Sequence, residues 1–300
     1  MRTGRSLEGG YVSEQPILVT GATGNTGSPL VEQLTQRGAA IRVMVRGPGD
    51  AAKFDQARVS VVVADFDDAQ SINAALDGIG QAYLVTPSSE KAAEQQMRFA
   101  EIALDAGVQH LVILSQFAAK PDSPVRFLRW HAEIERRVRE LGIGFTFLRP
   151  NLYFQGLLAF AGTIATSSRF FAPIGDARVS AVDVRDIAAV AAVALTEPGH
   201  SGQSYTITGP AAITHGEIAA ALTAALGREI TFVDVPPPEF ADGLRDVLPA
   251  WQVDGLLEDY AHYRRGEAAE VYPTVADITG RQPLDIEQFA RDDATAFAGR

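Results

Sequence analysis

The stretch "ILVTGATGNTGSPLVEQL", residues 17–34, decides the fold, because an apolar run leads into spaced glycines and then into an amphipathic segment. Gly21, Gly24 and Gly27 follow the pattern Gly-x-x-Gly-x-x-Gly. In a strand–turn–helix unit, the first glycine permits the tight turn, the second leaves room for a pyrophosphate, and the third lets the helix approach the strand. The predicted phosphate-binding residues, whose backbone N–H groups face the phosphate at the helix start, are Gly21, Thr23, Gly24, Asn25, Thr26 and Gly27.

Short apolar runs alternate with amphipathic stretches through the first half of the chain. The predicted strands are 17–20, 40–45, 59–64, 82–85, 111–114 and 145–148, and the predicted helices between them are 29–37, 69–76, 90–106 and 125–141. Strands that are apolar throughout are typical of a parallel sheet covered on both faces. The alternation therefore predicts an α/β fold built on a doubly wound parallel (Rossmann) sheet.

The pattern loosens after Arg149, where glycine, proline and aromatic residues become frequent. Predicted helices follow at 184–195, 215–226, 244–265 and 285–297, and predicted strands at 204–208 and 230–235. We expect three parts: a flexible arm at 1–15, a nucleotide-binding domain at 16–150, and a smaller, mainly helical substrate lobe at 151–300. This lobe is interleaved with the last strands and helices of the sheet, and ligands of such folds lie at the carboxyl ends of the strands.

Composition narrows the function. The net charge is −11, from 37 acidic and 26 basic residues, which argues against nucleic acid or an anionic membrane as a partner. The chain has no cysteine, which excludes thiolate chemistry, disulfides and zinc ribbons, and no cluster has metal-ligand spacing. Without a membrane-length apolar run or a signal peptide, we expect a cytoplasmic protein that binds a small apolar molecule. Monomer and homodimer remain open.

The end of the second predicted strand indicates which dinucleotide is bound. Rossmann sheets usually place an acid there to bind the ribose hydroxyls of NAD. This chain has Arg46, whose guanidinium attracts the 2′-phosphate that a carboxylate would repel. The sequence therefore predicts NADP(H) as the cofactor, with a solvated surface arginine as the alternative.

Three later segments stand in order: "FTFLRPNLYFQGLL" (145–158), "AVDVRDIAAVAAVAL" (181–195) and "ADITGRQPLDIEQFARD" (276–292). Together with the glycine loop, they make most of residues 16–298 resemble the NmrA-like family of atypical short-chain dehydrogenases/reductases. That family includes NAD(P)-sensing regulators, quinone and dye reductases, and ketone or imine reductases. The resemblance implies an NAD(P)-binding Rossmann fold.

Related folds also suggest further cofactor contacts. In "ADFDD", Asp65 is expected beside the adenine with Phe66 next to it, although such a run of acids also suits a helix N-cap. Thr86 and Pro87 follow the fourth strand and are expected near the nicotinamide ribose. At the end of the sixth strand, the cofactor contacts are expected to be Pro150 and Asn151.

The usual Ser, Tyr and Lys of short-chain dehydrogenases are incomplete here. Ser115 ends the fifth strand, but Phe127 stands at the tyrosine position and His131 at the lysine position. His131 has three interpretations: it binds the ribose hydroxyls, it is a general acid, or it is structural. Glu135, four residues further on, either holds the imidazole or is a solvated charge.

Tyr153 is the other candidate proton donor, so the predicted catalytic residues are His131, Tyr153 and Ser115. Aromatic residues around the cofactor–substrate boundary are predicted to contact the substrate, with packing of the lobe as the alternative. These are Phe117, Tyr153, Phe154 and Trp251. The segment "WQVDGLLEDYAHYRRG" (251–266) is expected to form an amphipathic lid helix.

The resemblance implies an oxidoreductase that uses NADPH to transfer hydride to an apolar conjugated carbonyl, quinone or imine, such as an intermediate of secondary metabolism. Without a tyrosine donor, such a reaction rests on proximity and orientation, with protons from solvent. Two other functions remain open. One is a non-catalytic NAD(P) sensor that binds a protein partner, and the other is an enzyme that catalyses a non-redox isomerisation or cyclisation.

Overall fold

A computed structural model describes residues 15–54 and 57–299 of the chain. Its centre is a parallel seven-stranded sheet with the order β3-β2-β1-β4-β5-β6-β8. The strands are β1 (Ile17–Val19), β2 (Ile41–Val45), β3 (Val59–Val63), β4 (Gln81–Leu84), β5 (His110–Leu114), β6 (Gly144–Pro150) and β8 (Gln203–Ile207). The strand order reverses between β1 and β4, which is the crevice where doubly wound sheets bind their ligands.

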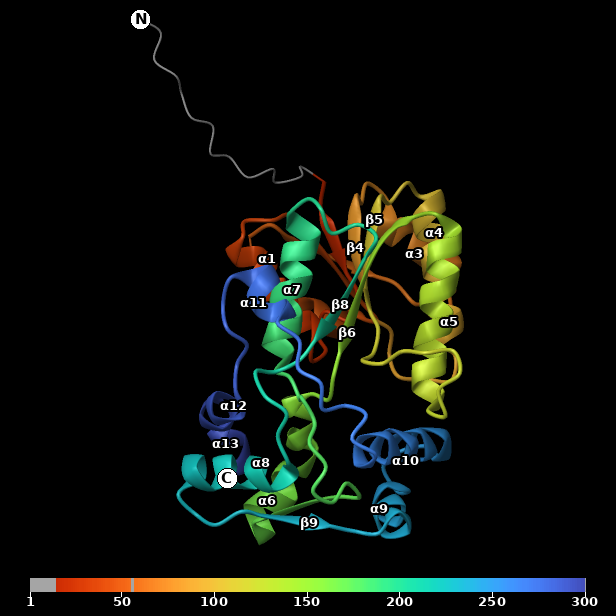
Figure 1. Ribbon diagram of the computed structural model, residues 1–300. Coiled ribbons are helices and arrows are strands. Elements are labelled where there is room, and N and C mark those ends of the chain that lie inside the picture. The colour runs from red at the N-terminus through yellow and green to blue at the C-terminus, as the bar shows by residue number, and fades with distance from the viewer. Residues whose placement is uncertain (1–14, 55–56, 300) are drawn as a thin grey trace, which may run out of the picture.

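Helices cover both faces of this sheet (Figure 1). One face carries α1 (Gly27–Gln36), α7 (Val184–Thr196) and α11 (Thr274–Thr279), and the other carries α3 (Ala69–Leu76), α4 (Ala92–Asp105) and α5 (Arg126–Leu141). Each face has its own buried core, with Leu30 and Val190 on one side and Ile72 and Phe99 on the other. The predicted doubly wound α/β fold is therefore confirmed.

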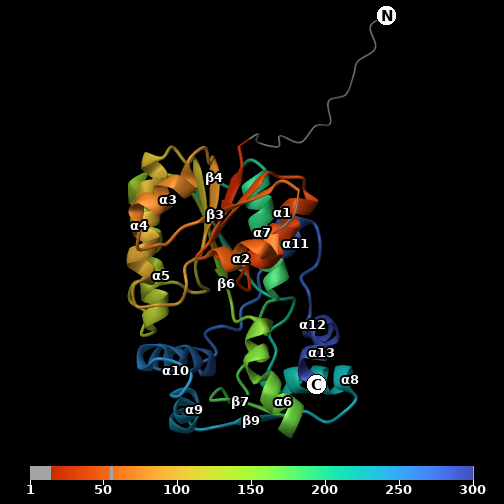
Figure 2. The same ribbon diagram turned by 180° about the vertical axis from the view of Figure 1, so that it is seen from behind.

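A second lobe lies beyond the carboxyl ends of the strands (Figures 1 and 2). Its own core contains Phe170, Leu222 and Phe289. The two strands β7 and β9 pair in parallel within it. Its elements are the 3₁₀ helix η2 (Phe154–Phe160), α6 (Ala161–Ser167), β7 (Arg169–Ala172), α8 (His215–Leu226), β9 (Thr231–Asp234), α9 (Pro237–Leu244), α10 (Ala250–Arg264), α12 (Ile286–Asp292) and α13 (Ala294–Phe297).

The chain returns from this lobe to the sheet before finishing. After β6 it enters the lobe through η2 and β7, then forms α7 and β8 on the sheet, and then enters the lobe again at α8. In the register of the last pair, Thr146 lies beside Gln203 and Pro150 beside Ile207. The two lobes are therefore joined by several chain crossings that fix the lobe over the strand ends.

Some elements differ from the sequence prediction. The helix expected at 244–265 begins only at Ala250, and the preceding proline-rich segment forms α9. Pro237 and Pro238 occupy the first turn of α9, where a missing N–H costs no intrahelical bond. The strand β7, the short α2 (Pro48–Ala51) and η1 (Ala52–Phe54) were not predicted, because each is only three or four residues long.

Of the predicted arm at 1–15, residues 1–14 lie outside the described residues. Within 15–54 and 57–299, no helix is both long and apolar enough to cross a membrane. The same residues contain no group of three or more potential metal ligands.

Candidate active site

The glycine loop is a backbone cradle with no room for side chains at two positions. Gly21 has a φ of +59°, and a Cβ atom there would lie 2.5 Å from Cγ1 of Val85. A Cβ atom at Gly27 would lie 2.1 Å from the Gly21 carbonyl oxygen. Gly24 closes the turn by donating its N–H to that same oxygen at 2.9 Å. Glycine is therefore required by the turn at 21 and by the close approach at 27.

The polar side chains of this loop divide into two kinds. Thr23 and Asn25 are exposed, whereas Thr26 is buried and its hydroxyl accepts a 2.9 Å hydrogen bond from the Tyr83 hydroxyl. Thr26 precedes α1 but its side chain makes no capping bond. At the start of α1, the Ser28 N–H donates to the Gly24 carbonyl at 3.1 Å and Pro29 has no N–H. Of the first-turn N–H groups, only that of Gly27 is without an acceptor in the described chain, so it is the one available to an anion.

Arg46 directly follows β2 and has an exposed side chain. Within the described residues it makes no hydrogen bond or ion pair. Its neighbours are engaged: Lys53 pairs with Asp50 at 2.8 Å, and Arg42 donates to the carbonyls of Ala75 and Asp77. The Arg46 guanidinium is therefore available for a phosphate.

The next expected contacts lie beside β3. The Asp65 side chain is exposed, and its Oδ1 accepts from the backbone N–H of Asp67 at 2.9 Å. The Phe66 ring is buried against Phe99, with the ring centroids 5.9 Å apart. Asp65 can still face an adenine, but the Phe66 ring belongs to the core, so only its backbone is left for that role.

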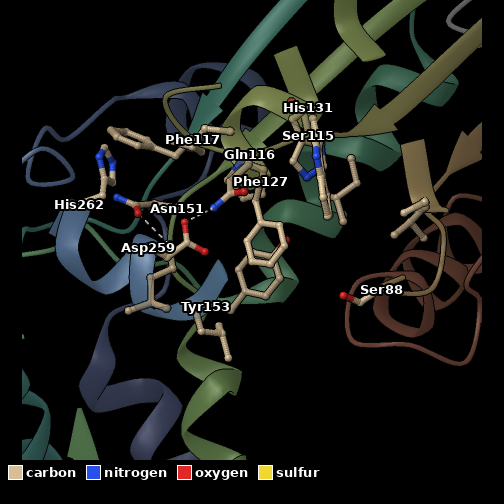
Figure 3. A pocket seen from close by; sticks show the side chains of 18 of the residues that line it. Ser88, Ser115, Gln116, Phe117, Phe127, His131, Asn151, Tyr153, Asp259 and His262 are labelled. Carbon is tan, nitrogen blue, oxygen red and sulfur yellow. Dashed lines mark hydrogen bonds between the residues drawn. The ribbon is translucent and has the colours of Figure 1, made fainter. Parts of the chain in front are cut away.

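A cavity of about 350 Å³ lies between the strand ends and the second lobe. It is bounded by the segments after β4, β5 and β6, by the first half of α5, and by α10. Its wall is mostly apolar, and the polar groups that line it include Ser115, Gln116, His131, Asn151, Asp259 and His262 (Figure 3). Val85 lines the cavity and also touches the glycine loop, so the cavity continues the phosphate-binding crevice.

Ser115 belongs to a buried charged network. Its hydroxyl donates to Oε1 of Glu135 at 2.6 Å, and Arg149 donates to both oxygens of the same carboxylate. Burial of Glu135 opposes its ionisation, but the hydrogen bonds from Arg149 and Ser115, with the charges of Arg149 and Arg139, outweigh it and lower the Glu135 pKa. The expectation for Glu135 was wrong: it is neither a solvated charge nor the partner of the imidazole, because Arg149 of β6 holds it beneath Ser115.

His131 lies beside Ser115 on the wall of the cavity (Figure 3). Its ring makes no hydrogen bond within the described residues. Burial lowers the pKa of His131 to about 4, against the opposing charge of Glu135. The imidazole is therefore neutral near pH 7, which suits a hydrogen-bonding contact better than proton donation.

Pro150 is the last residue of β6, Asn151 and Tyr153 follow it, and all three line the cavity. Burial, and the neighbouring Tyr83, raise the pKa of Tyr153, which makes it a weaker acid. The Asn151 amide donates to Ser180 Oγ and to the Ala268 carbonyl, both at 2.9 Å. The Asn151 side chain is therefore committed to holding the loop, and the Pro150 carbonyl accepts from the Phe117 N–H.

Of the remaining predicted contacts, some lie at the cavity and others pack elsewhere. Phe117 lines the cavity, and the Thr86 hydroxyl accepts from Gln96 at 3.0 Å beside exposed Pro87. Phe154 lies in the lobe core against Phe289, with centroids 5.6 Å apart. Trp251 packs on Phe127 and Trp130 behind the cavity wall.

The sequence analysis missed three polar residues of the cavity: Gln116, Asp259 and His262. The Asp259 side chain is buried and its Oδ1 accepts from Gln116 Nε2 at 3.1 Å. His262 bonds Oε2 of Glu267 through Nδ1 at 2.6 Å, while its buried Nε2 has no partner in the described chain. The sequence signal that could have identified Asp259 and His262 is their spacing, because residues three apart lie on the same face of a helix.

Residues 13–295 match the NmrA-like family. The chain is 36% identical over 282 residues to an NAD(P)H azoreductase of Xenophilus azovorans, covering 94% of this chain and 99% of that one. It is 35% identical to (4-alkanoyl-5-oxo-2,5-dihydrofuran-3-yl)methyl phosphate reductase of Streptomyces griseus, with the same coverage. The solved NADPH complex of an NADPH-dependent quinone oxidoreductase of Escherichia coli is similar with a TM-score of 0.83 and 28% identity, over 92% of this chain and 99% of that one.

Proposed function

Since this chain belongs to the NmrA-like family, we propose that it is a reductase that transfers hydride from NADPH to an apolar conjugated acceptor, namely a quinone, a conjugated carbonyl or an imine. The chain is an NAD(P)H-dependent oxidoreductase, and NADP(H) is its cofactor. The observation that carries the finer proposal is the apolar cavity, which opens from the phosphate-binding crevice at the strand ends.

The residues present fit a dinucleotide with a 2′-phosphate. A Cβ atom at Gly21 or Gly27 would overlap Val85 or the Gly21 carbonyl, so glycine at these positions keeps the tight turn on which a pyrophosphate would be held. Arg46 supplies an unpaired cation where an NAD-binding chain usually has an acid. When bound, the cofactor supplies the hydride. The chain orients the reactants, excludes water with its apolar side chains, and provides hydrogen bonds.

The lining of the cavity supports an uncharged, planar acceptor. Its apolar wall includes Phe117, Phe127, Tyr153 and Leu256. His131 is neutral near pH 7, and the Glu135 carboxylate beneath Ser115 is satisfied by Arg149, so neither presents a free charge. The names of similar proteins give an azo compound, a quinone and an oxo-dihydrofuran that also carries a methyl phosphate, and the reducible group of each is conjugated and uncharged.

The network beneath Ser115 has a positioning role in this proposal. Because the Ser115 hydroxyl donates to Glu135, its lone pairs, rather than its proton, face other groups. Ser115 and His131 therefore act as fixed hydrogen-bonding groups that orient the cofactor and the acceptor. Catalysis then depends on proximity and orientation.

The test is anaerobic oxidation of NADPH and of NADH by the purified protein with a quinone, an azo dye and a conjugated lactone. We expect turnover with at least one acceptor and a preference for NADPH. Equal, tight binding of all four nicotinamide nucleotides without turnover would support a sensor instead. A product of the same mass as the substrate would support a non-redox reaction.

A further inference from the structure

We propose that Asp259 is the proton donor of this reduction, with its carboxylic acid delivering a proton to the oxygen or nitrogen of the acceptor across the cavity from Ser115. This inference rests on the proposed reductase function. The acceptor gains a hydride, supplied by NADPH, and one proton, which the Asp259 O–H bond releases as it breaks. NADPH is oxidised to NADP⁺, and the Asp259 carboxylate that remains regains its proton from water.

The position of Asp259 is the first reason. It projects from α10 of the second lobe toward Gln116, which follows Ser115 at the end of β5 (Figure 3). The residue is only 6% exposed, yet it lines the cavity. Gln116 occupies Oδ1, and within the described residues Oδ2 has no hydrogen-bond partner. One carboxyl oxygen is thus oriented by the protein while the other is free to face a substrate.

The second reason is that Asp259 is a buried carboxyl with no cationic partner in the described chain. Arg126, which contacts α10, is bound to Glu258 at 2.7 Å and is 3.9 Å from Asp254. A buried carboxyl without a counter-ion takes up a proton rather than remain ionised. In this protonated form, Asp259 can act as an acid but binds cations poorly.

The groups around Asp259 act on its ionisation in opposite directions. Gln116, after β5, hydrogen-bonds it and favours ionisation; Glu258, on α10, disfavours it. The other titratable groups around the cavity are Tyr260, His262 and Tyr263 of α10, Tyr153 after β6, and His131 of α5. Burial is the largest effect and raises the pKa of Asp259 to about 7, which suits proton transfer near neutral pH.

The other polar groups of the cavity are less suitable donors. The Ser115 proton is held by Glu135. The pKa of His131 is lowered to about 4, so it carries no spare proton near pH 7, and the pKa of Tyr153 is raised above its ordinary value. The pKa of His262 is lowered by burial, although Glu267 opposes this. Asp259 is the cavity acid that can hold and release a proton in the neutral range.

The kinetic test uses Asp259→Asn, which keeps the size of the side chain and its bond to Gln116. We expect kcat to fall about 10²- to 10⁴-fold, with the dissociation constant of NADPH unchanged. In the wild type kcat should decrease as pH rises through about 7, and this decrease should vanish in the variant. Asp254→Asn is the control, because Asp254 lies on the same helix with an exposed side chain.

A second readout needs neither cofactor nor turnover. In protein labelled with ¹³C at the aspartate carboxyl carbons, the wild type should show one resonance that titrates near pH 7, and Asp259→Asn should lack it. Asp259→Glu should restore part of the lost kcat, because it restores the acid.

The outcomes separate the two proposals. A folded Asp259→Asn protein with wild-type kcat and an unchanged pH profile would overturn the role of Asp259 and leave the reductase function standing. Absence of any aspartate resonance that titrates near pH 7 would also overturn it. Failure of the wild type to oxidise NADPH with every acceptor would overturn both.

Discussion

The glycine loop and the cavity differ in how the chain builds them. The loop is one continuous stretch whose shape depends on backbone geometry. A single Cβ atom at Gly27 would overlap the Gly21 carbonyl. The cavity is assembled from the segments after β4, β5 and β6 with α5 and α10, and side chains do the work. The loop therefore tolerates almost no substitution at Gly21 and Gly27, whereas the cavity can change its chemistry one residue at a time.

This difference explains how one fold serves several acceptors. The cofactor end depends on positions that only glycine can fill, so it is the same for any substrate. In the proposed reductase the acceptor would lie against α10 and the aromatic wall, which other sequences can replace without moving the sheet. The predictions below test the two regions from the largest effect to the smallest.

Gly27→Ala should abolish NADPH binding and destabilise the fold by about 3 kcal/mol or more, because the new methyl group would overlap backbone atoms. Calorimetry with NADPH and thermal unfolding would measure both effects. Gly162→Ala is the matched control, since a Cβ atom there meets nothing within 4 Å. Retention of wild-type affinity in Gly27→Ala would show that the loop is not the rigid cradle described.

Glu135→Gln should cost about 3 kcal/mol of stability near pH 7, because it leaves Arg149 without its carboxylate partner. The Glu135 pKa is lowered in the folded protein, so its contribution is present above about 4.5 and is lost as pH falls through the folded value. Urea unfolding should therefore show the two proteins converging in acid. A difference that stays constant with pH would contradict this role for the carboxylate.

As pH rises, Asp259→Asn should change the free energy of unfolding in the opposite direction to Glu135→Gln. The wild-type pKa rises from 3.8 to about 7 on folding, so the folded state binds more protons between these values and its stability falls as pH rises. The variant lacks this loss, so its free energy of unfolding should rise relative to that of the wild type between pH 4 and 8. A difference in free energy of unfolding between the two proteins that is the same at pH 4 and at pH 8 would argue against a buried, protonated carboxyl.

Arg46→Glu should weaken NADPH binding by about 10- to 100-fold and leave NADH binding nearly unchanged, because it replaces the phosphate-binding cation by an acid. Arg58→Glu carries the same charge change at the amino end of β3, away from the cofactor crevice, and is the control. Affinities for both nucleotides would be measured at one salt concentration. If Arg46→Glu kept the wild-type preference for NADPH over NADH, Arg46 would not be the residue that binds the 2′-phosphate.

His131→Gln should have the smallest effect, a loss of about 3-fold in NADPH affinity, since a neutral imidazole offers one hydrogen bond that glutamine partly replaces. The pH profile of kcat in the neutral range should be unaffected. A large loss of kcat with a shifted profile would instead favour His131 as a general acid.

The same contrast determines what could be predicted from the sequence. Strands such as 17–20 and 111–114 were predicted because their apolar character is local, and Gly21 and Gly27 because their spacing is local. Asp259 was missed because the face of α10 that turns inward depends on how the lobe docks. Phe154 was assigned to the substrate because it follows the sixth strand, and Trp251 because it lies in the expected lid helix. The structure packs them on Phe289 and Trp130.

Glu135 shows the limit most clearly. Helical spacing related it to His131. Besides Arg139 of its own helix, its partners are Ser115, after β5, and Arg149 of β6, which are twenty and fourteen residues away in sequence. A pattern along one helix cannot show which strand ends lie beneath it. Tertiary contacts of this kind decide which acids are ionised, and they therefore decide the chemistry of the site.

The most direct test of the central claim is transfer of deuterium from NADPH labelled at the reactive carbon of the nicotinamide to a conjugated ketone or lactone in a single turnover. The account predicts a product that carries one deuterium on carbon from the cofactor and one hydrogen from solvent, with the labelled nicotinamide oxidised. Cofactor that binds tightly but stays reduced, with no label in any product, would contradict it and would indicate a protein that senses the nucleotide without using it.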